Sequence, residues 1–241
     1  MYLENVITDA RDPQRLGRFW ETALGAAGLT DAPEGYETRL SVGDGFTLDL
    51  GFPRVPDPDP SPGRPRLHLD LAPGPDQEAT VERLLYLGAS HLDIGQGDVP
   101  WVVLADPEGH PFCVLEEREV YCGTGPLAAL ALASADPERD CGFWSWLTGW
   151  DHVPDLRPRT LRHSSGRGPH LEFVPETTPA AEAKNPLHLD VRLEAGDDPD
   201  DVGAAIVARG GRALDPGWGE LPWRVYEDPS GNEFCVLPAP K

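Results

Sequence analysis

The chain of 241 residues has no long apolar run and very little lysine. No apolar stretch approaches the roughly 20 residues of a membrane span, and the opening MYLENVITDARD is acidic where a secretion signal is basic and then apolar. Twenty basic residues, of which only Lys184 and Lys241 are lysine, face 41 acidic ones, so the net charge is −21. Such a surface repels phosphate backbones and anionic lipids. We therefore expect a cytoplasmic protein that binds neither nucleic acid nor membranes.

Several chemical signatures are also missing. The four cysteines form no CxxC pair, and the chain has no Gly-rich phosphate loop, serine elbow or HExxH motif. Cys113 and Cys235 occupy equivalent places in the two halves, which favours buried thiols over a disulfide between them. No helix start or neighbouring base would lower their pKa, so we assign both thiols to the core.

The chain instead contains a long internal repeat. Residues 88–115 and 210–237 align without a gap and match at 15 of 28 positions, including Pro-Trp, Asp-Pro-x-Gly and Phe-Cys-Val-Leu. The Asp-Pro and Phe-Trp pairs of residues 12–20 recur at 136–144, and Leu-His-Leu-Asp at 67–70 recurs at 187–190. Because these motifs recur in the same order in both halves, they indicate a tandem duplication of a unit near 120 residues. We predict two domains, 1–118 and 124–241, each with its own core.

Each half has the pattern strand, helix and short strands, twice over. Asp12 and Asp136 are typical helix caps, and Gly25 ends the first helix. Phe19-Trp20 and Phe143-Trp144 lie at helical spacing from Leu16 and Leu147 respectively, and they are predicted to lie in the helix–sheet core. The segment DPDPSPGRPR at 57–66 is predicted to be an extended crossover loop. The fold class is therefore α+β, with two βαβββ-like modules in each domain forming an open, barrel-like cup with outer helices.

These landmarks resemble the vicinal-oxygen-chelate superfamily, in its glyoxalase-like and bleomycin-resistance branch. The resemblance covers nearly the whole chain twice. The superfamily includes isomerases, dioxygenases, thiol transferases and metal-free drug-sequestering proteins. Its metal-using members resemble one another in a His, Glu, His, Glu set from the first and last strands of the modules. The first copy offers Asn5, Asp49 (or Gly51), His68 and Cys113 at these places, and the second offers Ala129, Glu172, His188 and Cys235.

Both copies depart from this metal pattern at two or more places, since asparagine is a poor ligand and alanine is none. The resemblance therefore implies no cofactor, with a divalent metal open only in the second copy, where His188 and Glu172 are weak candidates. His68 and His188 each precede an aspartate by two residues, so each pair shares a strand face. The histidine of such a pair could act as a base, a hydrogen-bond donor or a metal ligand. The alternative, which we favour slightly, is a structural His–Asp hydrogen bond that closes the seam of the barrel.

The other candidate binding residues each have a second interpretation. His170 and Glu172 share a face that we place beside the strand of His188, although a polar strand face explains them equally well. Arg39 and Arg162 match each other and could bind a carboxylate or phenolate or be solvated edge residues. Trp101 and Trp223 could form an aromatic wall, but packing at a strand start is favoured. The predicted ligand-binding set is Arg39, Asp49, His68, Asp70, Trp101, Arg162, His170, Glu172, His188, Asp190 and Trp223; no catalytic residue is assigned.

Three functions follow from this pattern. The first is a metal-independent binding protein that sequesters an apolar or aromatic metabolite or antibiotic in one or both cups. The second is a lyase, isomerase or dioxygenase that uses His188 and Glu172, with or without a divalent metal. In the third, one cup is functional and the other is a structural partner. In each case the partner is a small molecule and the chain is a monomer or a homodimer.

Overall fold

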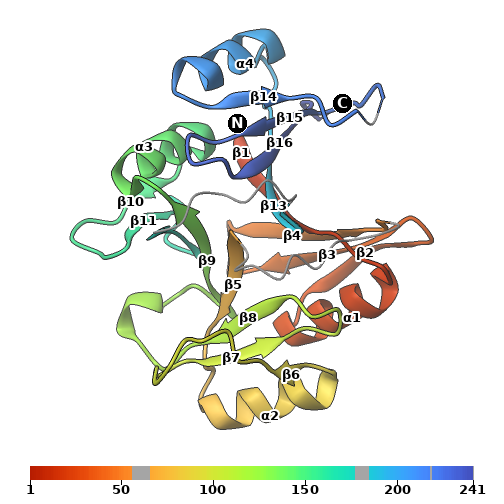
Figure 1. Ribbon diagram of the computed structural model, residues 1–241, viewed down its shortest axis with the longest axis vertical. Helices are drawn as coiled ribbons and strands as arrows, with labels where there is room; N and C mark the ends of the chain where they lie inside the picture. Colours follow the sequence, from red (N-terminus) through yellow and green to blue (C-terminus); the bar gives the residue numbers. More distant parts are fainter. Residues whose placement is uncertain (56–65, 177–184, 218, 241) are drawn as a thin grey trace.

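The computed structural model describes residues 1–55, 66–176, 185–217 and 219–240, which form four modules of one design (Figure 1). Each module starts with a strand, continues with a helix and ends with three strands. The first contains β1 (Tyr2–Thr8), α1 (Pro13–Leu24), β2 (Ala27–Ala32), β3 (Gly35–Ser41) and β4 (Thr47–Pro53). The second contains β5 (Leu67–Leu71), α2 (Gln77–Leu87), β6 (Ser90–His91), β7 (Val102–Ala105) and β8 (Pro111–Val114).

The second repeat has the same design. Its first module contains β9 (Leu127–Ser134), α3 (Pro137–Thr148), β10 (Asp151–His152), β11 (Arg159–Arg162) and β12 (His170–Pro175). Its last contains β13 (Leu187–Arg192), α4 (Pro199–Ala208), β14 (Arg212–Leu214), β15 (Arg224–Glu227) and β16 (Glu233–Leu237). A short 3-10 helix, η1 (Glu119–Tyr121), lies in the linker between the repeats.

The predicted helix starts are confirmed by their capping bonds. The side chains of Asp12 and Asp136 accept hydrogen bonds from the backbone N–H of the residue three positions later, and a proline follows each cap. Such caps satisfy N–H groups that the first helical turn leaves without partners. Gly25 ends α1 with φ 62°, in the left-handed region that suits glycine at this position.

The modules pair across the repeats and form two eight-stranded sheets. One sheet has the order β14-β15-β16-β13-β1-β4-β3-β2 and the other β10-β11-β12-β9-β5-β8-β7-β6. The first and last modules thus share the terminal sheet, and the two middle modules share the central sheet. The seams are the antiparallel pairs β1–β13 and β5–β9. We call the face of the terminal sheet that bears His188 and Asp190 the terminal cup. The face of the central sheet that bears His68 and Asp70 is the central cup.

This pairing explains the layout of the core. The prediction of a separate core in each half is wrong, because one main cluster of buried apolar side chains draws on all four modules. The helix-side faces of both sheets contribute to it: Phe19 of α1 packs against Phe112 of β8, and Phe143 of α3 against Phe234 of β16. Each contact joins a helix of one sheet to a strand of the other. The α+β class, the tandem repeat and the absence of a closed barrel among the described residues are as predicted.

Two equivalent hydrogen bonds tie the sheets together. The indole N–H of Trp20 donates to Asp106 Oδ2 at 3.2 Å, and that of Trp144 donates to Asp228 Oδ2 at 2.9 Å. Both aspartates open an Asp-Pro-x-Gly turn and also accept turn N–H groups. Burial raises the pKa of Asp228, against the lowering effect of the bonds from Asn232 and Trp144. Trp20 and Trp144 are therefore structural, as their predicted place in the helix–sheet core leads one to expect, and the Asp-Pro-x-Gly turns accept their N–H groups.

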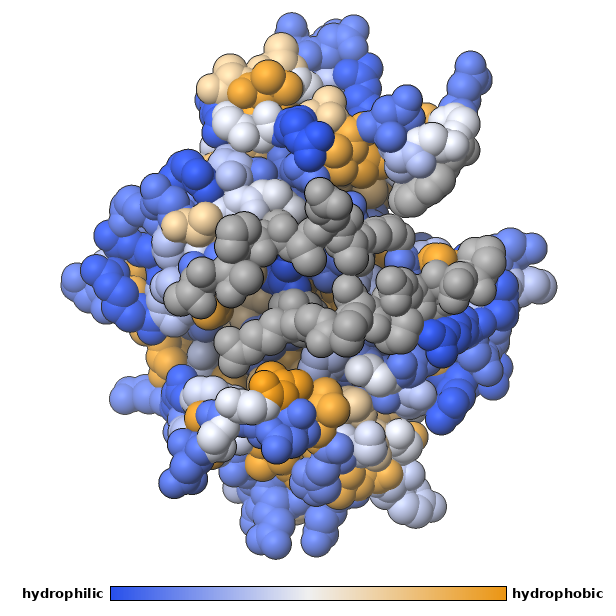
Figure 2. Space-filling model, in the orientation of Figure 1, coloured by the Kyte–Doolittle hydropathy of each residue, from blue (hydrophilic) through white to orange (hydrophobic). Residues whose placement is uncertain are grey.

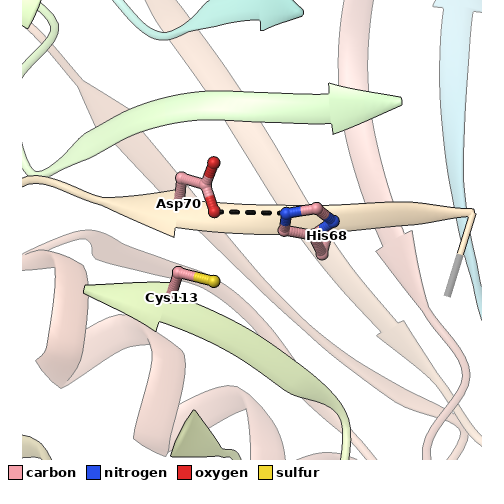
Figure 3. Close-up of side chains that lie close together, drawn as sticks. All are labelled: His68, Asp70 and Cys113. Carbon is pink, nitrogen blue, oxygen red and sulfur yellow. Dashed lines mark ion pairs between the residues drawn. The ribbon is translucent and has the colours of Figure 1, made fainter. Parts of the chain in front are cut away.

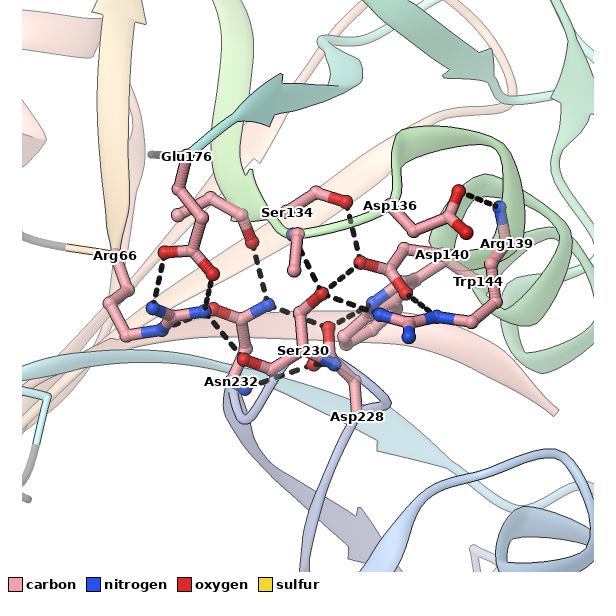
Figure 4. A network of polar contacts seen from close by, with 12 residues as sticks. Arg66, Ser134, Asp136, Arg139, Asp140, Trp144, Glu176, Asp228, Ser230 and Asn232 are labelled. Carbon is pink, nitrogen blue, oxygen red and sulfur yellow. Dashed lines mark hydrogen bonds and ion pairs between the residues drawn. The ribbon is translucent and has the colours of Figure 1, made fainter. Parts of the chain in front are cut away.

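A second polar network joins the central sheet to the β15–β16 turn (Figure 4). The guanidinium of Arg66 bonds Glu176 at 2.6 Å, the side-chain oxygen of Asn232 at 2.8 Å and the carbonyl of Ser230 at 2.8 Å. Ser134 and Ser230 both donate to Asp140 of α3. A largely buried arginine with three kinds of acceptor fixes the position of the last module against the middle ones.

The viewed surface is mostly hydrophilic, with small separate hydrophobic areas (Figure 2), as the net charge leads one to expect. Within the described ranges, no helix combines the length and the apolar character needed to cross a bilayer. The predicted loop at 57–66 falls, apart from Arg66, outside the described residues. The outer strands β2, β6, β10 and β14 were not predicted.

Candidate functional site

The strand register brings polar side chains into one row across the terminal cup. Asn5 of β1 lies opposite Asp49 of β4 and Asp190 of β13, and Asp190 lies opposite Cys235 of β16. Paired residues of neighbouring strands point to the same face of a sheet. Four strands from two different repeats therefore supply one continuous polar row.

The central cup has the equivalent row with different residues. Ala129 of β9 lies opposite His170 of β12 and Asp70 of β5, and Asp70 lies opposite Cys113 of β8. The aspartate and the cysteine are thus shared by both cups. Alanine replaces asparagine, and histidine replaces Asp49. This register places His170, rather than Glu172, opposite Ala129.

Both cups contain a compact His, Asp and Cys group. His188 Nε2 lies 3.4 Å from Asp190 Oδ1, and His68 Nε2 lies 3.3 Å from Asp70 Oδ1 (Figure 3). In each group the ligand atoms of histidine, aspartate and cysteine lie within 4.8 Å of one another. The prediction that each His–Asp pair shares a face is confirmed.

The thiols were assigned to the core, and both are buried. The structure adds that they face the carboxylates, because the side chain of Cys235 hydrogen-bonds Asp190. No pattern in the sequence indicates this contact, since the cysteines stand 43 and 45 positions from their aspartates (113 − 70 and 235 − 190). Only the register of the parallel pairs β5–β8 and β13–β16 brings them together.

Asp190 is the most perturbed acid of the terminal cup. Burial raises its pKa to about 7, while hydrogen bonds from Asn5 and Cys235 act in the opposite direction. Burial disfavours the charged form of a carboxyl group, which explains the direction. A carboxyl that titrates near neutral pH beside an imidazole can exchange a proton with a bound molecule.

The two matched arginines have different partners. Arg39 forms a bidentate ion pair with Asp49, with Nε–Oδ1 at 2.6 Å and Nη2–Oδ2 at 2.7 Å. Arg162 instead donates to the backbone carbonyls of Cys122 and Gly166 at 2.6 and 2.7 Å. Arg39 therefore belongs to the terminal cup, whereas Arg162 holds the linker between the repeats.

That linker inserts a side chain into the central cup. The hydroxyl of Tyr121 donates to Glu172 Oε1 at 2.9 Å, and its ring centroid lies 5.4 Å from that of His170. Burial and the charge of Glu172 raise the pKa of Tyr121. Sequence reasoning missed Tyr121 because the linker has no counterpart in the other repeat.

The two matched tryptophans also differ. Trp223 lines an open pocket of about 340 Å³ with Leu214, Leu221 and Val225, at the β14–β15 end of the terminal sheet. Trp101 packs against the small apolar cluster of the central sheet, formed by Val103, Cys113, Leu115 and Ala128. The aromatic-wall interpretation suits Trp223, and the packing interpretation suits Trp101.

One expected combination does not form. His188 lies on β13 of the terminal sheet and Glu172 on β12 of the central sheet, so they belong to different cups. β12 pairs with β9, and β9 pairs with β5, which carries His68 and Asp70. The prediction that His170 and Glu172 lie beside the strand of His188 is therefore wrong. The expectation assumed that the modules of one repeat pair with each other. Periodicity fixes the face of a residue but not the partner of its module.

A four-ligand metal site does not fit either row. In the terminal cup both oxygens of Asp49 are engaged by Arg39, and Asn5 donates its amide to Asp190 at 3.3 Å. In the central cup Ala129 has no donor atom. The three-residue His, Asp and Cys groups do fit the N, O and S ligands that zinc accepts. The expectation of no cofactor is therefore not supported, because both cups contain a group that could hold a metal.

Comparison with known proteins gives the family. A model described as Glyoxalase-like domain matches residues 5–115 and 129–237. The chain belongs to this family, as a tandem pair of such domains. No curated protein matches its sequence.

Solved structures with the same fold span the whole chain. A point mutant of glyoxalase I from Zea mays has a TM-score of 0.63 at 17% identity, covering 98% of this chain and 93% of its own. A putative dioxygenase from Bacillus subtilis has a TM-score of 0.60 at 14% identity, covering 100% and 86%. At these identities the likeness shows the fold of the tandem chain and leaves its ligand to be argued from the site.

Proposed function

We propose that this protein binds an apolar or aromatic small molecule, a metabolite or antibiotic, in the terminal cup and does so without a metal. The observation that supports the proposal most is the difference between the cups. The terminal cup has an open pocket beside its polar row, whereas the central cup receives Tyr121 from the linker. An open, largely apolar pocket with few polar groups is typical of small-molecule sites.

The geometry suggests how such a ligand is held. Val225, which lines the pocket, pairs with Cys235, and Cys235 pairs with Asp190. The pocket wall and Asp190 are therefore two strands apart, or about 10 Å. A planar ligand of that length would stack on Trp223 at one end and hydrogen-bond Asp190 or His188 at the other.

Thermal-shift measurements with a panel of planar aromatic metabolites and aromatic antibiotics, in the presence of EDTA, test the proposal. A compound that binds only the folded state raises the unfolding temperature, and the shift increases with the ratio of its concentration to its Kd. We expect the shift to be lost in Trp223→Ala and kept in Trp101→Ala, the matched residue of the other repeat. A shift that needs Trp101 and not Trp223 would contradict this site, and so would a panel that gives no shift.

A second candidate function is an enzyme of the lyase, isomerase or dioxygenase type. The pKa of Asp190, raised to about 7 by burial beside His188, favours it, since proton transfer is efficient when a catalytic pKa lies near the working pH. Here His188 would act with Asp190 and not with Glu172. A metal held by His188, Asp190 and Cys235 would supply Lewis-acid chemistry. Metal analysis of the purified protein, with product formation that is lost in Asp190→Asn, would select the enzyme over the binding protein.

We propose further that the partner is this small molecule alone, without nucleic acid or membrane, and that the protein works in the cytoplasm. The net charge of −21 supports this proposal. The shared core supplies within one chain the contact between modules, which supports a monomer, with a homodimer as the alternative. Light scattering of the purified protein distinguishes these two states.

A further inference from the structure

Tyr121 sits in the central cup as a bound molecule would. It comes from the linker and not from the sheet, and its hydroxyl donates to Glu172 Oε1 at 2.9 Å. Its ring centroid lies 5.4 Å from that of His170. The tyrosine thus enters the cup from outside, with its polar end at a buried carboxylate.

One side of the slot is apolar. Tyr121 packs against the cluster that contains Val103, Cys113 and Leu115, and Trp101 packs against the same cluster. An apolar wall with a buried carboxylate at the hydroxyl end of the tyrosine matches a phenol in shape and polarity. Toluene would fit the apolar part equally well but would leave Glu172 without a donor.

His170 gives an independent sign of a ligand. Its side chain is 1% exposed, and neither ring nitrogen has a hydrogen-bond partner among the described residues. Its nearest acid is Glu172, with Nδ1 3.8 Å from Oε1. Buried polar groups without partners are costly and uncommon in folded proteins. Tyr121 therefore hydrogen-bonds Glu172 and leaves His170 without a hydrogen bond.

The linker is held in place by two hydrogen bonds. The partly buried Arg162 donates to the carbonyl of Cys122, and Thr124 Oγ1 donates to the carbonyl of Tyr121 at 2.9 Å. The matching arginine of the terminal cup pairs with Asp49 across the strands. In the central cup His170 stands in that place, so the arginine serves the linker.

We propose that the central cup is a second small-molecule site, specific for phenols with a second hydrogen-bonding group, and that Tyr121 fills it in the free protein. The phenol hydroxyl would donate to Glu172 and the second group would bond His170. This site is separate from the terminal cup, and it stands or falls independently of the ligand proposed there.

Chemical rescue tests the proposal. Tyr121→Ala removes a side chain whose shape is that of p-cresol, and we expect p-cresol to bind this variant and raise its unfolding temperature. Toluene should bind at least about tenfold more weakly, because a hydrogen bond to a buried charged group is lost. Catechol should bind more tightly than phenol, and His170→Phe in the same background should remove that difference.

The control is Tyr86→Ala, which removes a tyrosine that is 91% exposed on α2 and should give no response to p-cresol. Equal binding of toluene and p-cresol, or no binding of either, would overturn the proposal. If Tyr121→Ala does not fold, hydrogen exchange of residues 116–126 in the wild type decides. The proposal requires faster exchange as catechol displaces Tyr121, and unchanged exchange at saturating catechol rejects it.

Discussion

The two cups of this protein have the same strand order and the same His, Asp and Cys group, yet they are closed to different degrees. In the terminal cup Arg39 pairs with Asp49, and Trp223 borders an open pocket. In the central cup Arg162 bonds the linker, and Tyr121 occupies the space in front of Glu172. The replacement of Asp49 by His170 accompanies this change of arginine partner. A duplicated scaffold can therefore keep its core while one copy of the site becomes filled by the chain itself.

The largest expected difference between the cups is in pH dependence. In metal-free protein, folded Asp190 stays protonated up to about pH 7, whereas the unfolded carboxyl ionises near its model value of 3.8. The folded state then binds more protons in this window, so the free energy of unfolding falls as pH rises from about 4 to 7, by on the order of 4 kcal/mol at most.

Urea unfolding at a series of pH values, with EDTA present, measures this effect. Asp190→Asn should flatten the dependence over that window. Asp70→Asn, the matched change in the central cup, leaves Asp190 intact and should keep the wild-type slope. If the free energy of unfolding depends on pH equally steeply in Asp190→Asn and in the wild type, then Asp190 is not the cause of the pH dependence.

The next effect concerns packing. Tyr121→Ala removes an aromatic side chain from an apolar cluster and leaves Glu172 without its donor, so we expect a loss of about 2–3 kcal/mol in stability. Trp223→Ala acts at an open pocket and should cost less than about 1 kcal/mol. Chemical denaturation of both variants compares them directly, and a larger loss from Trp223 would reverse the assignment of open and closed cups.

A smaller difference separates the two arginines. Arg162→Ala should cost about 1 kcal/mol and speed the hydrogen exchange of residues 116–126, because the carbonyl of Cys122 in the linker loses the donor that ties it to the carbonyl of Gly166 in the β11–β12 connection. Arg39→Ala breaks a partly exposed ion pair and should cost about 0.5 kcal/mol without changing that exchange. Equal exchange in the two variants would argue against a tether at Arg162.

The smallest expected effect is that of metal removal. If the terminal cup binds its ligand without a metal, then the thermal shift given by an aromatic compound is the same before and after treatment with EDTA. A shift that disappears with EDTA and returns with zinc would instead assign the His188, Asp190 and Cys235 group to a metal.

Much of the architecture was predictable because it is local. The caps Asp12 and Asp136, the Phe-Trp core pairs and the strands at Leu127–Ser134 and Glu233–Leu237 follow from short-range patterns. The outer strand β2 is almost wholly exposed and β6 and β10 have only two residues each, so they lack the alternation that signals a strand. The partner of each module is a long-range choice that periodicity does not encode.

The candidate site was predictable in part for the same reason. The shared face of each His–Asp pair follows from a spacing of two residues, and the structure confirms it. Tyr121 could not be found, because it lies in a linker that occurs once and has no repeat to mark it. The separation of His188 from Glu172 depends on which modules pair. That pairing is known only from the strand register of β1–β13 and β5–β9.

Proton–proton contacts in solution measured by nuclear Overhauser effects test the central claim most directly. The account predicts contacts across β1–β13 and β5–β9, which join the two repeats, and contacts between the rings of Tyr121 and His170. Contacts between β1 and β5 in place of these, or a Tyr121 ring with no contact to His170, would contradict it.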